Sequence, residues 1–133
     1  MTNNKSKPTT SEKDVFHSIL NSCSEAKGID LVALDVKGHF DLANKFIIVS
    51  GRSDRHTQGI ANRIQADLEK YKIEPISVEG FNKAHWILLD FDETIVHIFY
   101  EDTRKFYELE KLWEKADKIN VEKILEVKKQ KAA

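Results

Sequence analysis

The fold is decided by Trp86-Ile87-Leu88-Leu89-Asp90-Phe91, a stretch that continues after a short turn as Ile95-Val96-His97-Ile98-Phe99-Tyr100. Alternate side chains of a β-strand point to opposite faces of its sheet. Ile87, Leu89 and Phe91 therefore form a fully apolar face, which suits a core. Trp86, Leu88 and Asp90 share the other face, where two bulky apolar groups stand beside a carboxylate, and this mixture suits a docking surface better. The turn Asp92-Glu93-Thr94 joins the two strands and predicts an antiparallel hairpin.

Helical and strand patterns alternate on the N-terminal side of this hairpin. Residues 12–27 carry apolar side chains at helical spacing, and Gly28 follows them as a common helix stop. Ser53 is placed to cap a second helix that runs to about residue 71. Strands are predicted at residues 31–36, 46–49 and 76–78. The second strand, the helix after it and the third strand form a right-handed crossover, in which the two strands run parallel.

The segment after the hairpin predicts one more helix, which begins near Arg104. Its apolar residues fall along one stripe at helical spacing: Leu109, Leu112, Trp113 and Ala116. The fold class is therefore α/β, with a single domain over residues 12–116. We expect a mixed sheet of about five strands flanked by helices.

Charge is distributed unevenly along the chain. Residues 1–11 form a polar arm that is predicted to be disordered, and residues 117–133 form a basic tail that is either helical from Asn120 or frayed. The part between them, residues 14–116, holds 13 Lys and Arg against 18 Asp and Glu, a net charge of −5. An acidic folded part argues against a nucleic-acid-binding surface and is compatible with a basic protein partner.

The composition is typical of one soluble domain: 133 residues, of which 41% are hydrophobic and 32% charged. The single cysteine, Cys23, excludes an internal disulfide and a cysteine-based zinc site. The N-terminal residues lack the apolar segment of a secretory signal, and no stretch is long and apolar enough to cross a bilayer. These features predict a cytoplasmic protein.

One pattern suggests chemistry, in the form of a small nucleotidyltransferase-like nucleotide-binding protein. Gly51-Arg52-Ser53 lies at a strand-to-helix turn, where a phosphate can be held, and Asp90-Phe91-Asp92 offers carboxylates for magnesium. Such enzymes place their paired aspartates soon after the Gly-Ser turn, whereas here about 40 residues intervene. A helix cap at Ser53 and a turn residue at Asp92 are the simpler interpretations.

The histidines and serines give no catalytic or metal-binding pattern. None of the five histidines has the i, i+4 spacing of a helical zinc pair: His17, His39, His56, His85 and His97. The serines lack the context of a nucleophile elbow, and no glycine-rich loop matches a phosphate-binding or dinucleotide motif. We therefore predict a binding protein rather than an enzyme, without a metal or cofactor.

Several segments stand in the order and spacing of one known family. In the N-terminal half these are Leu34-Asp35-Val36, Phe46-Ile47-Ile48-Val49-Ser50-Gly51 and Ser53-Asp54-Arg55-His56. In the C-terminal half they are residues 86–90, 95–97 and 107–113. Over roughly residues 12–114 the chain resembles the ribosomal silencing factor family, also called Iojap. That family is similar in fold to nucleotidyltransferases, so the resemblance implies a nucleotidyltransferase-like fold.

The resemblance implies a function without bond chemistry. Proteins of this family bind the large ribosomal subunit through large-subunit ribosomal protein fourteen and sterically block joining of the small subunit, which represses translation when nutrients are short. Carried over residue by residue, the family's interface falls on Trp86, Leu88, Asp90 and Tyr107. Their neighbours Phe91 and Glu108 are weaker candidates for the same interface.

Some features leave alternatives open. Family members usually have a glycine in the hairpin turn, where this chain has Asp92-Glu93. The basic tail either touches ribosomal RNA or is inert. An uncovered strand face also permits pairing of two copies of the chain, so a homodimer is a further hypothesis.

Overall fold

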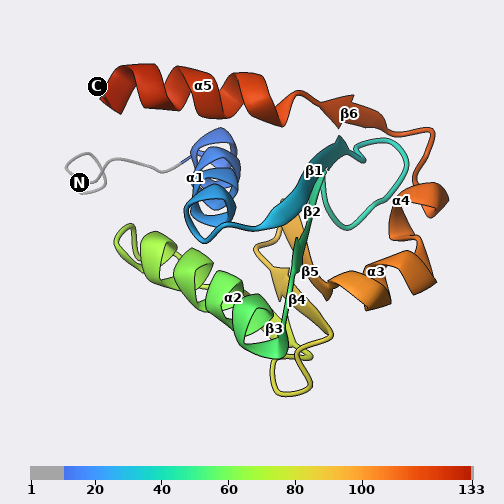
Figure 1. Cartoon of the computed structure of the whole chain (residues 1–133). Helices are drawn as coiled ribbons and strands as arrows, with labels where there is room; N and C mark the ends of the chain where they lie inside the picture. Colours follow the sequence, from blue (N-terminus) through green and yellow to red (C-terminus); the bar gives the residue numbers. More distant parts are fainter. Residues whose placement is uncertain (1–10, 133) are drawn as a thin grey trace.

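A six-stranded mixed sheet forms the centre of the computed structural model, which describes residues 11–132 and the side chains of residues 11–126 (Figure 1). The strands are β1 (Ile29–Asp35), β2 (Lys45–Gly51), β3 (Ser77–Glu79), β4 (Trp86–Asp90), β5 (Thr94–Tyr100) and β6 (Asp117–Ile119). The helices are α1 (Glu12–Glu25), α2 (Asp54–Glu69), α3 (Glu101–Tyr107), α4 (Leu109–Leu112) and α5 (Val121–Ala132). None of these helices is long and apolar enough to span a membrane.

Neighbouring strands follow the order β3-β4-β5-β2-β1-β6. In the described chain β2 and β5 run parallel, whereas the other neighbouring strands are antiparallel. The predicted hairpin is confirmed, because β4 and β5 pair with Ile87 opposite Ile98. The predicted α/β class with a mixed sheet is confirmed as well, with six strands in place of about five.

The two strands of the predicted crossover run parallel, as expected, but they are not neighbours in the sheet. Strand β3 runs the same way as β2, yet β5 and β4 lie between them in the sheet. The lengths of the strands explain why β5 and not β3 lies next to β2. β5 pairs with β2 over seven residues, from Lys45 opposite Thr94 to Gly51 opposite Tyr100, whereas β3 has three residues and pairs with β4.

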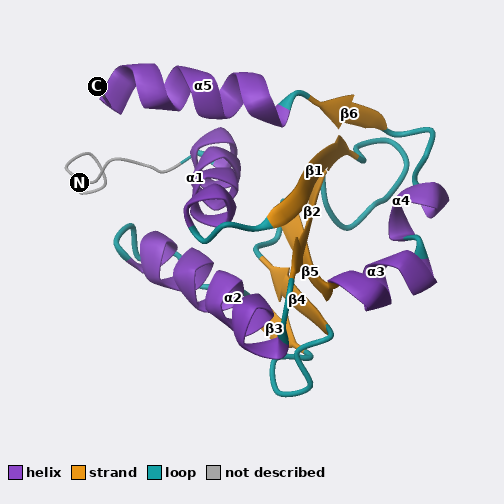
Figure 2. Cartoon of the chain, viewed as in Figure 1, coloured by secondary structure: helices purple, strands orange, loops and turns teal. Residues whose placement is uncertain are grey.

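Each face of the sheet has its own core, and helices lie on both sides of the sheet (Figure 2). Helices α1, α2 and α5 cover one face, where Ile19 and Ile64 pack in the same cluster as Ile87 and Leu89 of β4. Helices α3 and α4 lie on the opposite side (Figure 1), where the second and smaller cluster surrounds Phe46 and includes Trp86 and Leu88 at its margin. The alternation predicted for β4 is therefore confirmed.

The extent predicted for the last helix is wrong. Helix α3 ends at Tyr107, Glu108 adopts the left-handed backbone conformation (φ 46°), and the short helix α4 begins at Leu109. This bend breaks the predicted stripe, so that Leu112 is 75% exposed although Leu109 is buried. Trp113 does pack inward, with its ring centroid 5.2 Å from that of Phe46.

The chain beyond residue 116 continues within the fold. Strand β6 pairs with β1, with Ile119 opposite Ala33, and α5 buries Val121 in the core shared with α1. Of the two alternatives for the tail the structure contains the helix, and the Asn120 side chain accepts a hydrogen bond from the Lys123 amide in its first turn (3.0 Å). Strand β6 begins directly after the boundary expected at residue 116 and belongs to the same sheet as the strands before it. The expected arm lies outside the described residues except for Ser11, which caps α1.

Candidate protein-docking site

Trp86, Leu88 and Asp90 project from β4 to the side of the sheet that carries α3 and α4. All three side chains are half-buried, in contrast to Ile87 and Leu89 between them, which are fully buried on the other side. Only the three-residue strand β3 separates β4 from the edge of the sheet. The predicted docking face is thus a strip of β4 close to that edge.

The Trp86 ring joins β4 to its neighbours by three contacts. Its centroid lies 4.8 Å from that of Phe99 on β5 and 4.9 Å from that of Tyr107 on α3. Its indole N–H donates a hydrogen bond to Nδ1 of His97 (3.2 Å). The structure therefore brings together Trp86 and Tyr107, which lie 21 residues apart in the sequence.

An open hollow of about 520 Å³ lies beside this ring pair. It is lined by Gly80, Lys83, His85, Trp86, Tyr100, Asp102, Thr103, Phe106 and Tyr107. Phe106 is 80% exposed and Tyr107 is 51% exposed, and their rings meet edge to face at 5.1 Å. Phe106 was not among the predicted site residues, although a large apolar residue that falls off the buried side of its helix is a recognisable signal of a binding surface.

Asp90 has a structural contact at the other end of the strip. Its Oδ1 accepts a hydrogen bond from the Asp92 amide (2.8 Å), which braces the hairpin turn. Asp92 has a φ of 76°, a left-handed conformation that favours glycine. A residue other than glycine is strained in this conformation, so the Asp90 carboxylate supports a strained turn.

The two weaker candidates occupy different places. Glu108 is exposed at the bend after α3, next to Tyr107, and its carboxylate lies 3.4 Å from the Lys111 ammonium. Phe91 points to the opposite side of the sheet and is buried in the core with α1 and α2. Five of the six predicted residues thus lie on one side of the sheet, whereas Phe91 lies on the other.

A buried arginine holds the bend that positions Tyr107. The Arg104 guanidinium donates two hydrogen bonds to Glu110 on α4 (3.1 and 2.9 Å) and one to the Ser50 hydroxyl on β2 (2.9 Å). The hydrogen bonds from Arg104 lower the pKa of the Glu110 carboxyl. Because this contact ties α3, α4 and β2 together, it fixes the position of the Tyr107 end of the site. No local pattern in the sequence indicates this role of Arg104, because its partners lie on other elements.

The residues considered for nucleotide binding do not come together. Ser53 caps α2 by accepting a hydrogen bond from the His56 amide (3.0 Å), as the simpler interpretation predicts. It follows the end of β2, whereas Asp90 aligns through Ile95 with Phe46, near the start of β2. Five residues of strand, or roughly 17 Å, separate the two ends. Among the described side chains no group of three or more His, Cys, Asp or Glu is placed to hold a metal ion.

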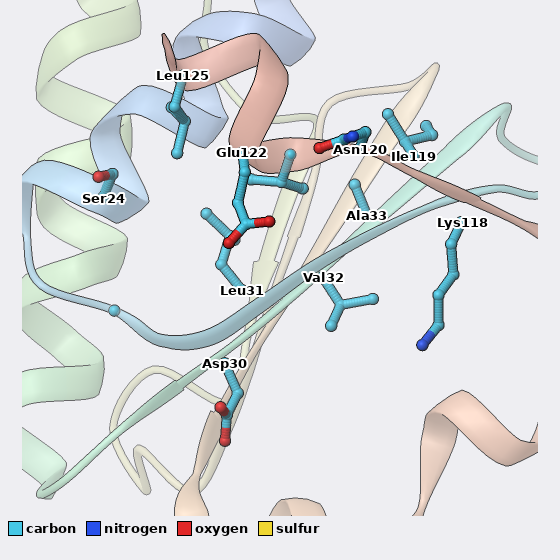
Figure 3. Close-up of a pocket in the computed structure, with 12 residues that line it drawn as sticks. Ser24, Asp30, Leu31, Val32, Ala33, Lys118, Ile119, Asn120, Glu122 and Leu125 are labelled. Carbon is cyan, nitrogen blue, oxygen red and sulfur yellow. The ribbon is translucent and has the colours of Figure 1, made fainter.

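A second hollow, of about 490 Å³, lies between the end of α1, strand β1 and the start of α5 (Figure 3). Leu31 and Leu125 contribute apolar walls, and Asp30, Lys118 and Glu122 carry its charges. These charged groups come from three elements and do not converge on one point (Figure 3). This hollow therefore lacks the convergent polar groups that mark a ligand site.

Comparison with known proteins agrees with the resemblance seen in the sequence. The family model described as "Ribosomal silencing factor during starvation" matches residues 8–133. The chain belongs to the ribosomal silencing factor family. It is 35% identical over 102 residues to the ribosomal silencing factor RsfS of Bacillus subtilis, an alignment that covers 77% of this chain and 86% of that protein.

Two further relatives bear on the fold and the partner. The crystal structure of a protein from Chromobacterium violaceum matches with a TM-score of 0.76 at 25% identity, and covers 78% of this chain and 87% of that one. The mouse protein named "Mitochondrial assembly of ribosomal large subunit protein 1" is 30% identical over 87 residues, which is 63% of this chain and 38% of the mouse protein. The family and its fold are thereby confirmed.

Proposed function

We propose that this protein represses translation by occupying the large ribosomal subunit. It binds through large-subunit ribosomal protein fourteen, in the cytoplasm, and its bulk keeps the small subunit from joining when nutrients are short. Support comes from the family, which is named for ribosomal silencing during starvation, and from the mouse relative, whose name refers to the large subunit.

The observation that carries the proposal is the aromatic group at the docking face. Trp86, Phe106 and Tyr107 surround one hollow and leave apolar area exposed, and tryptophan and tyrosine often carry the binding energy of an interface. The carboxylates of Asp90 and Glu108 lie on the same side of the molecule. Residues 14–116 as a whole carry a net charge of −5, which is compatible with a basic ribosomal protein as the partner.

The mechanism requires occupancy alone. A bound protein of 15.3 kDa excludes any partner that needs the same surface, and no bond is made or broken. Silencing then depends on the concentration of the protein relative to its Kd for the subunit. A rise in its concentration relative to ribosomes is sufficient to shift the balance toward separated subunits.

Sedimentation with purified ribosomal subunits tests this proposal. We expect the protein to migrate with the large subunit and not with the small one, and to reduce the formation of joined ribosomes as its concentration rises. Migration with the small subunit alone, or with neither, would contradict the proposal.

Two tyrosines of similar exposure provide a matched pair of variants. Tyr107 is 51% exposed at the docking face, and Tyr71 is 55% exposed after the end of α2. We expect Tyr107→Ala to weaken large-subunit binding by roughly 10- to 100-fold, because truncated aromatic anchors commonly cost about 1.4–2.8 kcal/mol. Tyr71→Ala should bind as the wild type does. Equal affinities for the two variants would place the interface elsewhere.

A ribosomal RNA contact and a homodimer are two further predictions, which are tested separately. A ribosomal RNA contact by the basic tail would make large-subunit binding more dependent on salt, because each neutralised phosphate releases counterions. A homodimer would bury the same apolar face and would dissociate as the large subunit is added. Sedimentation velocity across a range of salt and protein concentrations distinguishes the two.

A further inference from the structure

His97 stands out as a polar side chain in an apolar strand. It lies in the middle of β5, between Val96 and Ile98, and is 5% exposed. Aromatic rings surround its imidazole, with the Phe46 centroid at 5.0 Å and the Phe99 centroid at 6.3 Å. An aliphatic residue would fill such a site at lower cost, because the buried imidazole must lose its hydrogen bonds to water.

The hydrogen bond with Trp86 determines the state of this imidazole. An indole nitrogen is only a donor, so His97 Nδ1 must accept through its lone pair (3.2 Å). The ring is therefore neutral, and its proton is on Nε2. That Nε2 atom is buried and has no hydrogen-bond partner among the described residues. Among the described residues Nε2 of His97 is thus left without a hydrogen-bond partner, whereas Nδ1 accepts from Trp86.

Burial supports the same assignment. It lowers the pKa of His97 to about 4, so the acceptor at Nδ1 is available at neutral pH. The cross-strand register explains the contact: Leu88 lies opposite His97, and Trp86 lies opposite Phe99, so His97 and Trp86 are diagonal neighbours on one face. Each ring lies within reach of the other because of this register.

We propose that His97 is a positioning residue of the docking face, which holds the Trp86 indole against Tyr107 before the partner arrives. A side chain that is ordered in advance loses less rotamer freedom on binding, and this raises affinity without adding a contact to the partner. The proposal rests on the proposed function, because it assigns to Trp86 a place in the interface with the large subunit. We expect the loss of this hydrogen bond to weaken large-subunit binding by about 3- to 10-fold.

The test uses two substitutions at His97. His97→Leu removes the acceptor and fills the apolar site, whereas His97→Asn keeps an oxygen acceptor near the position of Nδ1. The indole N–H signals of Trp86 and Trp113 are recorded by NMR with their hydrogen exchange, and Trp86→Phe assigns them. We expect His97→Leu to shift the Trp86 signal and to speed its exchange, while the Trp113 signal stays in place. His97→Asn should restore most of the wild-type signal and affinity.

A control separates positioning from general stability. Val96 lies on the same strand and is fully buried on the opposite side of the sheet. The substitution Val96→Ala therefore opens a cavity away from Trp86. It should lower the melting temperature without changing the Trp86 signal or the affinity of the folded protein for purified large subunits. If Val96→Ala weakens binding as much as His97→Leu does, the role of His97 is only structural and the proposal is wrong.

Two other results would overturn the proposal, and they are distinguishable from failure of the proposed function. An unchanged Trp86 signal in His97→Leu would show that the hydrogen bond does not hold the ring, whatever the ribosome does. A shifted Trp86 signal in His97→Leu together with wild-type affinity would show that positioning is not needed, provided that Tyr107→Ala binds poorly. Wild-type affinity of Tyr107→Ala would instead contradict the docking face itself.

Discussion

The stability of the protein should fall as the pH is lowered from about 6.5 to about 4, because of one buried histidine. Burial lowers the pKa of His97 from 6.5 to about 4, whereas in the unfolded chain the imidazole titrates near its ordinary value. Between these values the unfolded state binds the proton and the folded state does not. The stabilisation is therefore fully present above the unfolded pKa and is lost as the pH falls through the folded pKa.

The magnitude follows from the interval between the two pKa values. From 6.5 to about 4 is an interval of about 2.5 pH units, and at about 1.4 kcal/mol per unit this gives a loss on the order of 3 kcal/mol. Urea unfolding at several pH values between 4.5 and 7.5 measures the loss in the wild type and in His97→Asn, which has no group that titrates in this range at position 97. The wild-type curve should fall more steeply toward low pH. Asp67 and Glu110, whose pKa values are lowered, affect both proteins alike. Parallel curves for the two proteins below pH 6.5 would show that protonation of His97 does not cause the loss of stability.

Three further predictions follow from the docking face and the C-terminal part of the chain. Asp90→Asn keeps an oxygen for the Asp92 amide and should leave the melting temperature nearly unchanged, whereas Asp90→Lys should slow association with the large subunit at low salt, an effect that shrinks at high salt. An on-rate of Asp90→Lys equal to that of the wild type at low salt would remove this carboxylate from the interface. Arg104→Met should destabilise the protein by about 1–3 kcal/mol in urea unfolding, because it leaves the buried Ser50 hydroxyl and the Glu110 carboxylate without their partner. Adding Glu110→Gln to Arg104→Met should cost less than the sum of the single changes, and strict additivity would contradict a coupled pair. Deletion of residues 117–133 should lower the melting temperature by several degrees, since it removes β6 and the buried Val121, and an unchanged melting temperature would show that this segment adds nothing to the fold.

The parts of the fold that were predictable from the sequence are those that depend on local chemistry. The alternation in residues 86–91 assigned each side chain of β4 to the correct face, because the period of a strand is two. Ser53 caps α2 as expected, because a serine hydroxyl before a helix satisfies a free amide of its first turn. Neither feature needs information from distant residues.

The parts that were missed depend on contacts between distant residues. Nothing in Asp117-Lys118-Ile119 indicates a strand, and β6 exists because the edge of β1 offers it hydrogen bonds. The bend at Glu108 places a non-glycine residue in the left-handed region, which local propensity disfavours. The hydrogen bonds from Arg104 to Glu110 and Ser50, which lie on two other elements, hold this bend.

The candidate site shows the same division. Trp86, Leu88 and Asp90 share a face by strand alternation, so their grouping was predictable. The hydrogen bond between Trp86 and His97 depends on the register of β4 against β5, which the geometry of the hairpin turn determines. A shift of one residue would have turned one of the two rings to the other side of the sheet.

The position of Trp86 has a consequence for how the docking face should be tested. Its ring packs against Phe99 and Tyr107 and belongs to the margin of the second core, so truncating it removes core contacts together with any interface contacts. A loss of binding in Trp86→Ala therefore mixes two causes. Phe106 and Tyr107 are mostly exposed, and their truncation disturbs the fold much less. The exposed pair on α3, rather than the tryptophan, separates the stability of the fold from the affinity for the ribosome.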